Sequence, residues 1–66
     1  SGSFSLETPG GKSFKVSNTP VTGSRKVTHE GTTKVVYVVG ATRDEARSLF
    51  AKYANVTRNS VKATVV

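Results

Sequence analysis

Lysine and arginine are the side chains of this sequence that could most clearly bind a ligand. They number ten against four Asp and Glu, which gives a formal net charge of +6 and a pI near 10.2. A surface of that sign attracts polyanions, because Lys and Arg neutralise phosphates while hydroxyls donate to phosphate oxygens. The charge therefore favours nucleic acid or an acidic protein as partner. An ordinary solvated surface is the alternative that carries no function.

The candidate phosphate contacts fall into two groups. One lies on the outer face and end of a predicted helix and comprises Arg43, Arg47 and Lys52. The other lies on predicted strands and turns and comprises Lys12, Lys15, Arg25, Lys26, Lys34 and Lys62. Within it, Lys15, Lys34 and Lys62 are predicted to share one outward sheet face with Ser and Thr hydroxyls. The sequence leaves open whether the sheet face or the helix face binds.

Stacking aromatics are scarce. Proteins that bind single strands stack bases on exposed aromatic rings, and only Tyr37 or Tyr53 could serve here. Tyr53 is expected in the core, on the same helical stripe as Leu49 and Phe50. The sequence therefore predicts a small basic module that contacts the nucleic-acid backbone, with little sequence readout.

Residues for catalysis are few. His29 is the only histidine, there is no cysteine, and two of the four carboxylates, Asp44 and Glu45, are explained by a helix cap. No Gly-rich phosphate loop or nucleophile motif is present. We therefore expect no enzyme, no cofactor and no metal site.

The central elements run from residue 34 to residue 54. Val35-Val36-Tyr37-Val38-Val39 is rich in β-branched residues and predicts a central strand that ends at Gly40-Ala41. Thr42 and Glu45 have the spacing of a capping box, which predicts a helix over 43–54. Its apolar stripe recurs at helical spacing and comprises Ala46, Leu49, Phe50 and Tyr53. Asn55 suits the left-handed position after the helix.

The remaining strands predict an α+β fold. Alternating residues at 4–6 and 14–16 predict a hairpin, with Pro9-Gly10 in a type II turn. Further strands are expected at 24–29, 32–39 and 61–65. The order β-β-β-β-α-β predicts one mainly antiparallel sheet of four to five strands with the helix packed on one face. Residues 1–66 are expected to form one small domain, of which 1–3 could be disordered or a cloning remnant.

One helix can bury only one face of the sheet, so the central strand carries surplus apolar surface. Either Val36 and Val38 or Val35, Tyr37 and Val39 must face away from the helix. The predicted contact for a partner or a second copy comprises Val36, Tyr37 and Val38. The alternative functions are therefore a protein-binding inhibitor or adaptor, and a self-associating, homodimeric structural protein of viral or phage type.

The longest apolar run is far shorter than the roughly 20 residues of a membrane-spanning helix. No signal-peptide pattern is visible at the start. We therefore expect no membrane partner, and a cytoplasmic or virion location rather than secretion.

Overall fold

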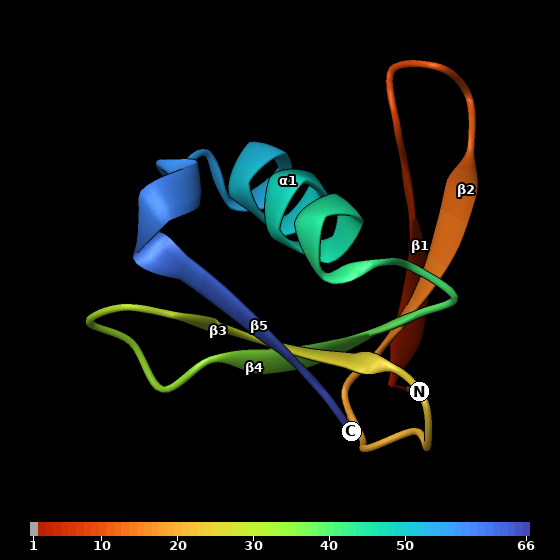
Figure 1. The fold of residues 1–66 in the computed structure, drawn as a ribbon, viewed down its shortest axis with the longest axis horizontal. Helices are drawn as coiled ribbons and strands as arrows, with labels where there is room; N and C mark the ends of the chain where they lie inside the picture. Colours follow the sequence, from red (N-terminus) through yellow and green to blue (C-terminus); the bar gives the residue numbers. More distant parts are fainter. Residues whose placement is uncertain (1) are drawn as a thin grey trace.

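The computed structural model describes residues 2–66 and shows one antiparallel five-stranded sheet with a single helix packed on it (Figure 1). This confirms the predicted fold class. In chain order the elements are β1 (Ser3–Glu7), β2 (Ser13–Ser17), β3 (Arg25–His29), β4 (Val35–Val39), α1 (Arg43–Ala54), the 3₁₀ turn η1 (Arg58–Ser60) and β5 (Val61–Val65). Ser3 belongs to β1, and the Gly2 carbonyl accepts from the Asn18 amide at 2.7 Å. The prediction for Ser1 falls outside the described residues.

The strand order is β1-β2-β4-β3-β5, so β4 lies at the centre and β1 and β5 form the two edges. Strands β2 and β3 flank β4, and the connection 18–24 between them must therefore cross β4. In Figure 1 it does so on the side of the sheet away from the helix. Helix α1 joins β4 to β5, which run in the same direction with β3 between them.

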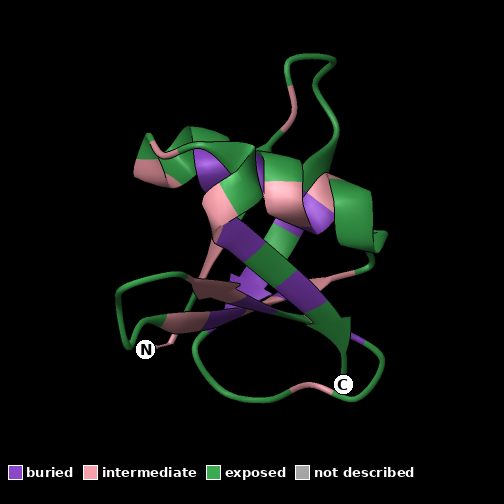
Figure 2. Ribbon diagram, turned by 60° about the vertical axis from the view of Figure 1, so that its left-hand side comes forward, coloured by how far each residue is buried: buried purple, intermediate pink, exposed green. Residues whose placement is uncertain are grey.

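The register of β4 decides which face of the sheet is the core. Val36 and Val38 are 2% and 0% exposed and pack with Phe50 under the helix, and β5 alternates buried and exposed residues in the same way (Figure 2). Val36 and Val38 are therefore core residues, which corrects their predicted place in a partner contact. Val35, Tyr37 and Val39 face the other side and are half-buried. Only Tyr37 of the predicted contact remains on the outward face.

Helix α1 has the predicted bounds because both of its ends are capped. The Thr42 hydroxyl accepts from the Glu45 amide at 3.1 Å, and the Thr42 amide donates to the Glu45 carboxylate at 2.9 Å. At the other end Asn55 adopts the left-handed conformation, with φ of 56°, and the Val56 amide donates to the Ala51 carbonyl. The capping box and the role of Asn55 are confirmed.

Two local predictions are wrong. A type II turn needs positive φ at Gly10, but the left-handed residue is Gly11, with φ of 89°. The Gly11 amide donates to the Thr8 carbonyl, and the loop follows the three-residue hairpin pattern with a left-handed glycine at its end. Strand β4 begins at Val35 rather than Thr32, because the Thr32 amide and hydroxyl both donate to the His29 carbonyl in a tight turn.

Tyr53 differs from its expected core position, since 48% of it is exposed. Its ring lies beside Phe4, with ring centroids 5.4 Å apart, and the Lys34 ammonium lies 5.6 Å from its centroid. Tyr53, the last aromatic residue of the helical stripe, therefore packs at the margin of the sheet, beside the edge strand β1.

Candidate nucleic-acid interface

Three lysines and a tyrosine share the side of the sheet that faces away from α1, which we call the open face. It comprises Lys15 of β2, Tyr37 of β4, Lys26 of β3 and Lys62 of β5. Lys26 is paired directly with Tyr37, and Lys15 and Lys62 are paired with Val39 and Thr28. Paired residues point to the same face, and diagonal neighbours lie about 7–8 Å apart. The three lysines therefore lie along a diagonal of the sheet, and the 18–24 connection crosses β4 on this face between Lys15 and Lys26.

Lys34 is not part of the open face, which corrects the predicted sheet-face group. It has the same alternation as Val36 and so points to the helix side, where its ammonium lies over the Tyr53 ring. Lys26 takes its place. The physical reason is the register of β4, which an apolar strand without polar alternation does not reveal.

An open groove of about 690 Å³ runs along the start of β5. Its walls come from the β3–β4 turn, the first turns of α1 and the residues around η1. We call it the edge groove, and its charged or titratable lining comprises His29, Glu30, Arg43, Asp44, Arg47 and Lys62. Lys62 therefore belongs both to the open face and to the edge groove. Arg43, predicted for the helix-face group, and Lys62, predicted for the sheet-face group, line one groove.

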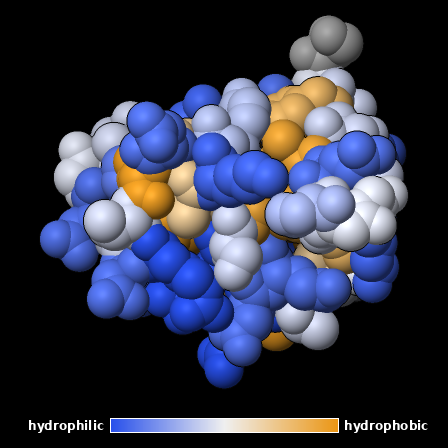
Figure 3. Space-filling model, turned by 90° about the horizontal axis from the view of Figure 1, so that it is seen from above, coloured by the Kyte–Doolittle hydropathy of each residue, from blue (hydrophilic) through white to orange (hydrophobic). Residues whose placement is uncertain are grey.

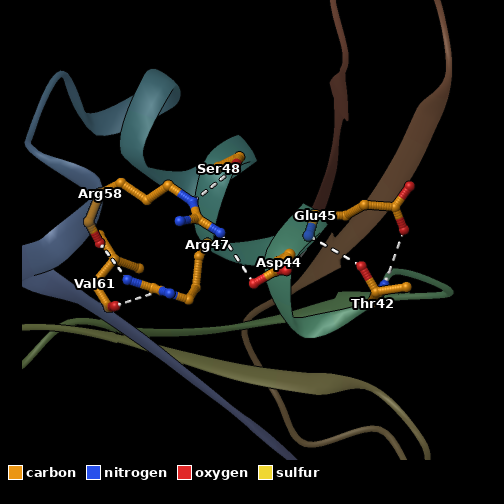
Figure 4. A network of polar contacts seen from close by, with 7 residues as sticks. All are labelled: Thr42, Asp44, Glu45, Arg47, Ser48, Arg58 and Val61. Atoms are coloured by element: carbon orange, nitrogen blue, oxygen red, sulfur yellow. Dashed lines mark hydrogen bonds and ion pairs between the residues drawn. The ribbon is translucent and has the colours of Figure 1, made fainter.

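Hydrogen bonds within the chain occupy two of the arginines near this groove (Figure 4). Arg47 donates from Nε to the Val61 carbonyl at 3.0 Å and from Nη2 to the Arg58 carbonyl at 3.1 Å. Arg58 donates to the Ser48 hydroxyl and pairs with the Asp44 carboxylate at 2.9 Å. Arg47 therefore links the helix to the edge strand β5 by hydrogen bonds. The role of Arg58 has no sequence signal, because its partner lies fourteen residues away.

The other groove cations are available for a ligand. Within residues 2–66 the side chains of Arg43 and Lys62 make no hydrogen bond or ion pair. The charge of Asp44 is balanced by Arg58, which leaves Glu30 as the one groove carboxylate without a paired cation among these residues. The groove consequently keeps a positive balance.

The remaining predicted cations lie apart from this surface. Arg25 is half-buried, and its Nη1 donates to the Gly23 carbonyl at 3.1 Å. Lys52 is exposed and borders a separate hollow beside Thr8 and Pro9. The helix side is a mosaic of hydrophilic residues with small hydrophobic patches between them (Figure 3). The predicted helix-face group of Arg43, Arg47 and Lys52 is therefore not one site.

Glu45 is held in its charged form at the start of the helix. The Thr42 amide that donates to its carboxylate lowers the pKa of Glu45 below its ordinary value, and the nearby Lys12 ammonium acts in the same direction. Lys12 lies 3.5 Å from the carboxylate and comes from the β1–β2 turn. This contact joins the hairpin to the helix on the side away from β5.

Neither a metal centre nor a membrane span is found in the described part of the chain. Residues 2–66 contain no group of three His, Asp or Glu that could hold a metal ion. The helix described among them is too short and too polar to cross a bilayer.

No protein-family model matches this chain, and no significant match was found among curated proteins or among solved structures.

Proposed function

We propose that this protein binds nucleic acid through phosphate contacts on the joined surface of the open face and the edge groove. The observation that supports this most is the position of Lys62. It stands on the open face diagonally next to Lys26, and it also lines the edge groove with Arg43. Cations from three elements, Lys26 of β3, Lys62 of β5 and Arg43 of α1, thus lie around the β5 edge, and such contacts suit a run of phosphates.

Contacts of this kind carry little sequence information. Lys and Arg that reach phosphates set position and affinity, whereas sequence is read from base edges. The outer helix surface is a weaker candidate, because Arg47 is engaged by main-chain carbonyls and Lys52 lies apart from Arg43, beside a separate hollow. The protein therefore acts as a general binder with a marked dependence on salt.

The test is a salt series with a fluorescently labelled oligonucleotide, read by anisotropy. In Lys62→Gln the slope of log K against log salt should fall in magnitude by about 0.7 to 0.9, because one phosphate contact is lost. Lys52→Gln is the matched control, since it removes the same charge from an exposed site bordering a different hollow. Equal losses in both variants, or no binding at low salt, would refute the proposal.

A protein partner or a second copy is the alternative function. The observation that favours it is the edge strand β5, whose last residue Val65 has an exposed apolar side chain, as does Val66 after it. Val35, Tyr37 and Val39 add half-buried apolar surface on the open face. Sedimentation over a range of protein concentrations tests self-association, and binding that persists at high salt would favour this function over nucleic acid.

A further inference from the structure

We infer that the nucleic acid bound here is single-stranded, and that it passes around the β5 edge from the open face into the edge groove. This inference rests on the proposed function and names its ligand class. Two independent features carry it: the direction in which the cations point, and the shape of the edge groove.

The cations lie on opposite faces of the sheet, near its β5 edge. Lys26 belongs to the face away from the helix, whereas Arg43 belongs to the first turn of the helix that covers the opposite face. Lys62 on β5, the edge strand, lies between them. A ligand that contacts all three must therefore bend around the margin of the sheet.

A duplex is too stiff to make that turn. Residues 2–66 span only 26 × 23 × 21 Å, whereas the persistence length of duplex DNA is about 150 base pairs, or about 500 Å. A duplex laid on the open face would therefore pass Arg43 without contact, and one laid along the groove would pass Lys26. A single strand has free backbone torsions and can follow both surfaces.

The edge groove has the size and chemistry for a single nucleotide. Its volume of about 690 Å³ lies within the usual range of about 300–1,000 Å³ for small-molecule sites. His29 and Asn59 line it, and within residues 2–66 neither side chain makes a hydrogen bond, so both can meet a base edge. Bases of single strands can be splayed out into such sites, whereas duplex bases are stacked and paired.

The experiment compares a fifteen-nucleotide single strand with the fifteen-base-pair duplex of the same sequence, in a salt series, for five proteins. These are the unmodified chain, Lys26→Gln, Arg43→Gln and the double variant, with Lys52→Gln as the charge-matched control. For the single strand, each variant should reduce the slope by about 0.7 and the double variant by about 1.4. For the duplex, at most one of the two substitutions should change the slope. Thermal unfolding verifies that every variant is folded.

The outcomes separate the inference from the proposal beneath it. Tighter binding of the single strand with loss at both positions supports the inference. Equal binding of the duplex, or sensitivity to Lys26→Gln alone, overturns it while nucleic-acid binding stands. If neither ligand binds at low salt, the proposed function itself fails.

Discussion

The guanidinium of Arg47 donates from Nε to the main-chain carbonyl of Val61 at 3.0 Å, which fastens the helix to the first residue of the edge strand. An edge strand has one side without a neighbour, so half of its main-chain groups need other partners. Arg47 supplies one of them from the helix. Although its position on the helix suggests phosphate binding, Arg47 therefore has a structural role.

Arg47 should matter for stability rather than for binding. Arg47→Lys keeps the charge, but a lysine ammonium cannot donate to the Val61 and Arg58 carbonyls at once as the planar guanidinium does. We therefore expect a loss of about 1–3 kcal/mol in the free energy of unfolding. Urea denaturation measures this. The salt slope for nucleic acid should stay unchanged, and a variant of unchanged stability that binds more weakly would refute the assignment.

Arg58→Gln provides a contrast to Arg47. Its ion pair with Asp44 is largely exposed, with 81% of the Asp44 side chain accessible to solvent, so solvent screens the attraction. We expect a loss below about 1 kcal/mol in the same denaturation experiment. A larger loss than that of Arg47→Lys would contradict this ranking of the two arginines.

The capping box should set the stability of the helix start. Thr42→Ala removes the acceptor for the Glu45 amide, and such changes cost about 0.5–2 kcal/mol. Thermal unfolding followed by circular dichroism measures this loss. Thr42→Ser keeps the hydroxyl and is the control, which should be close to the original protein. Equal losses in the two variants would show that the methyl group of Thr42, and not its hydroxyl, is what matters.

Glu45 should contribute a pH dependence of known sign. Its pKa is lowered in the folded protein, so its charged form adds stability above the ordinary pKa of 4.5. That contribution is lost as the pH falls from about this value through the lower folded pKa. Glu45→Gln keeps a capping side chain but has no charge, so the stability difference from the original protein should shrink below this range. A difference that is constant with pH would contradict the assignment.

The aromatic residues of the helix should differ sharply in importance. Phe50 is 2% exposed and lies at the centre of the core, so Phe50→Ala should cost about 3–5 kcal/mol and can unfold a domain of ordinary stability. Tyr53 is half-exposed at the sheet margin, and Tyr53→Ala should cost much less. Urea denaturation ranks the two, and equal costs would place Tyr53 in the core after all.

Sequence reasoning succeeds where the signal is local. The bounds of α1 follow from Thr42, Glu45 and Asn55, which act within one turn of the helix. The register of β4 could not be predicted, because a strand of valines and one tyrosine is apolar on both sides. For the same reason the sequence places Lys34 on the outward sheet face and leaves open whether Val36 and Val38 face the helix.

The joining of the two basic groups also lacks a sequence signal. Arg43 and Lys62 are separated by nineteen positions, and they meet only because β5 takes the edge next to β3 and runs beneath the first turns of α1. The sequence indicated the cations and their chemistry. Strand order, which depends on contacts between distant segments, decides which of them share a surface.

The most direct test of nucleic-acid binding at this surface is a ¹H–¹⁵N NMR titration of the protein with a short single-stranded oligonucleotide at low salt. The amides of 26–30, of 59–64 and of Arg43 should shift together and saturate together, while those of Lys52, Thr8 and Gly10 stay in place. Shifts confined to Lys52 and the outer helix surface, or no shifts at all, would contradict the account.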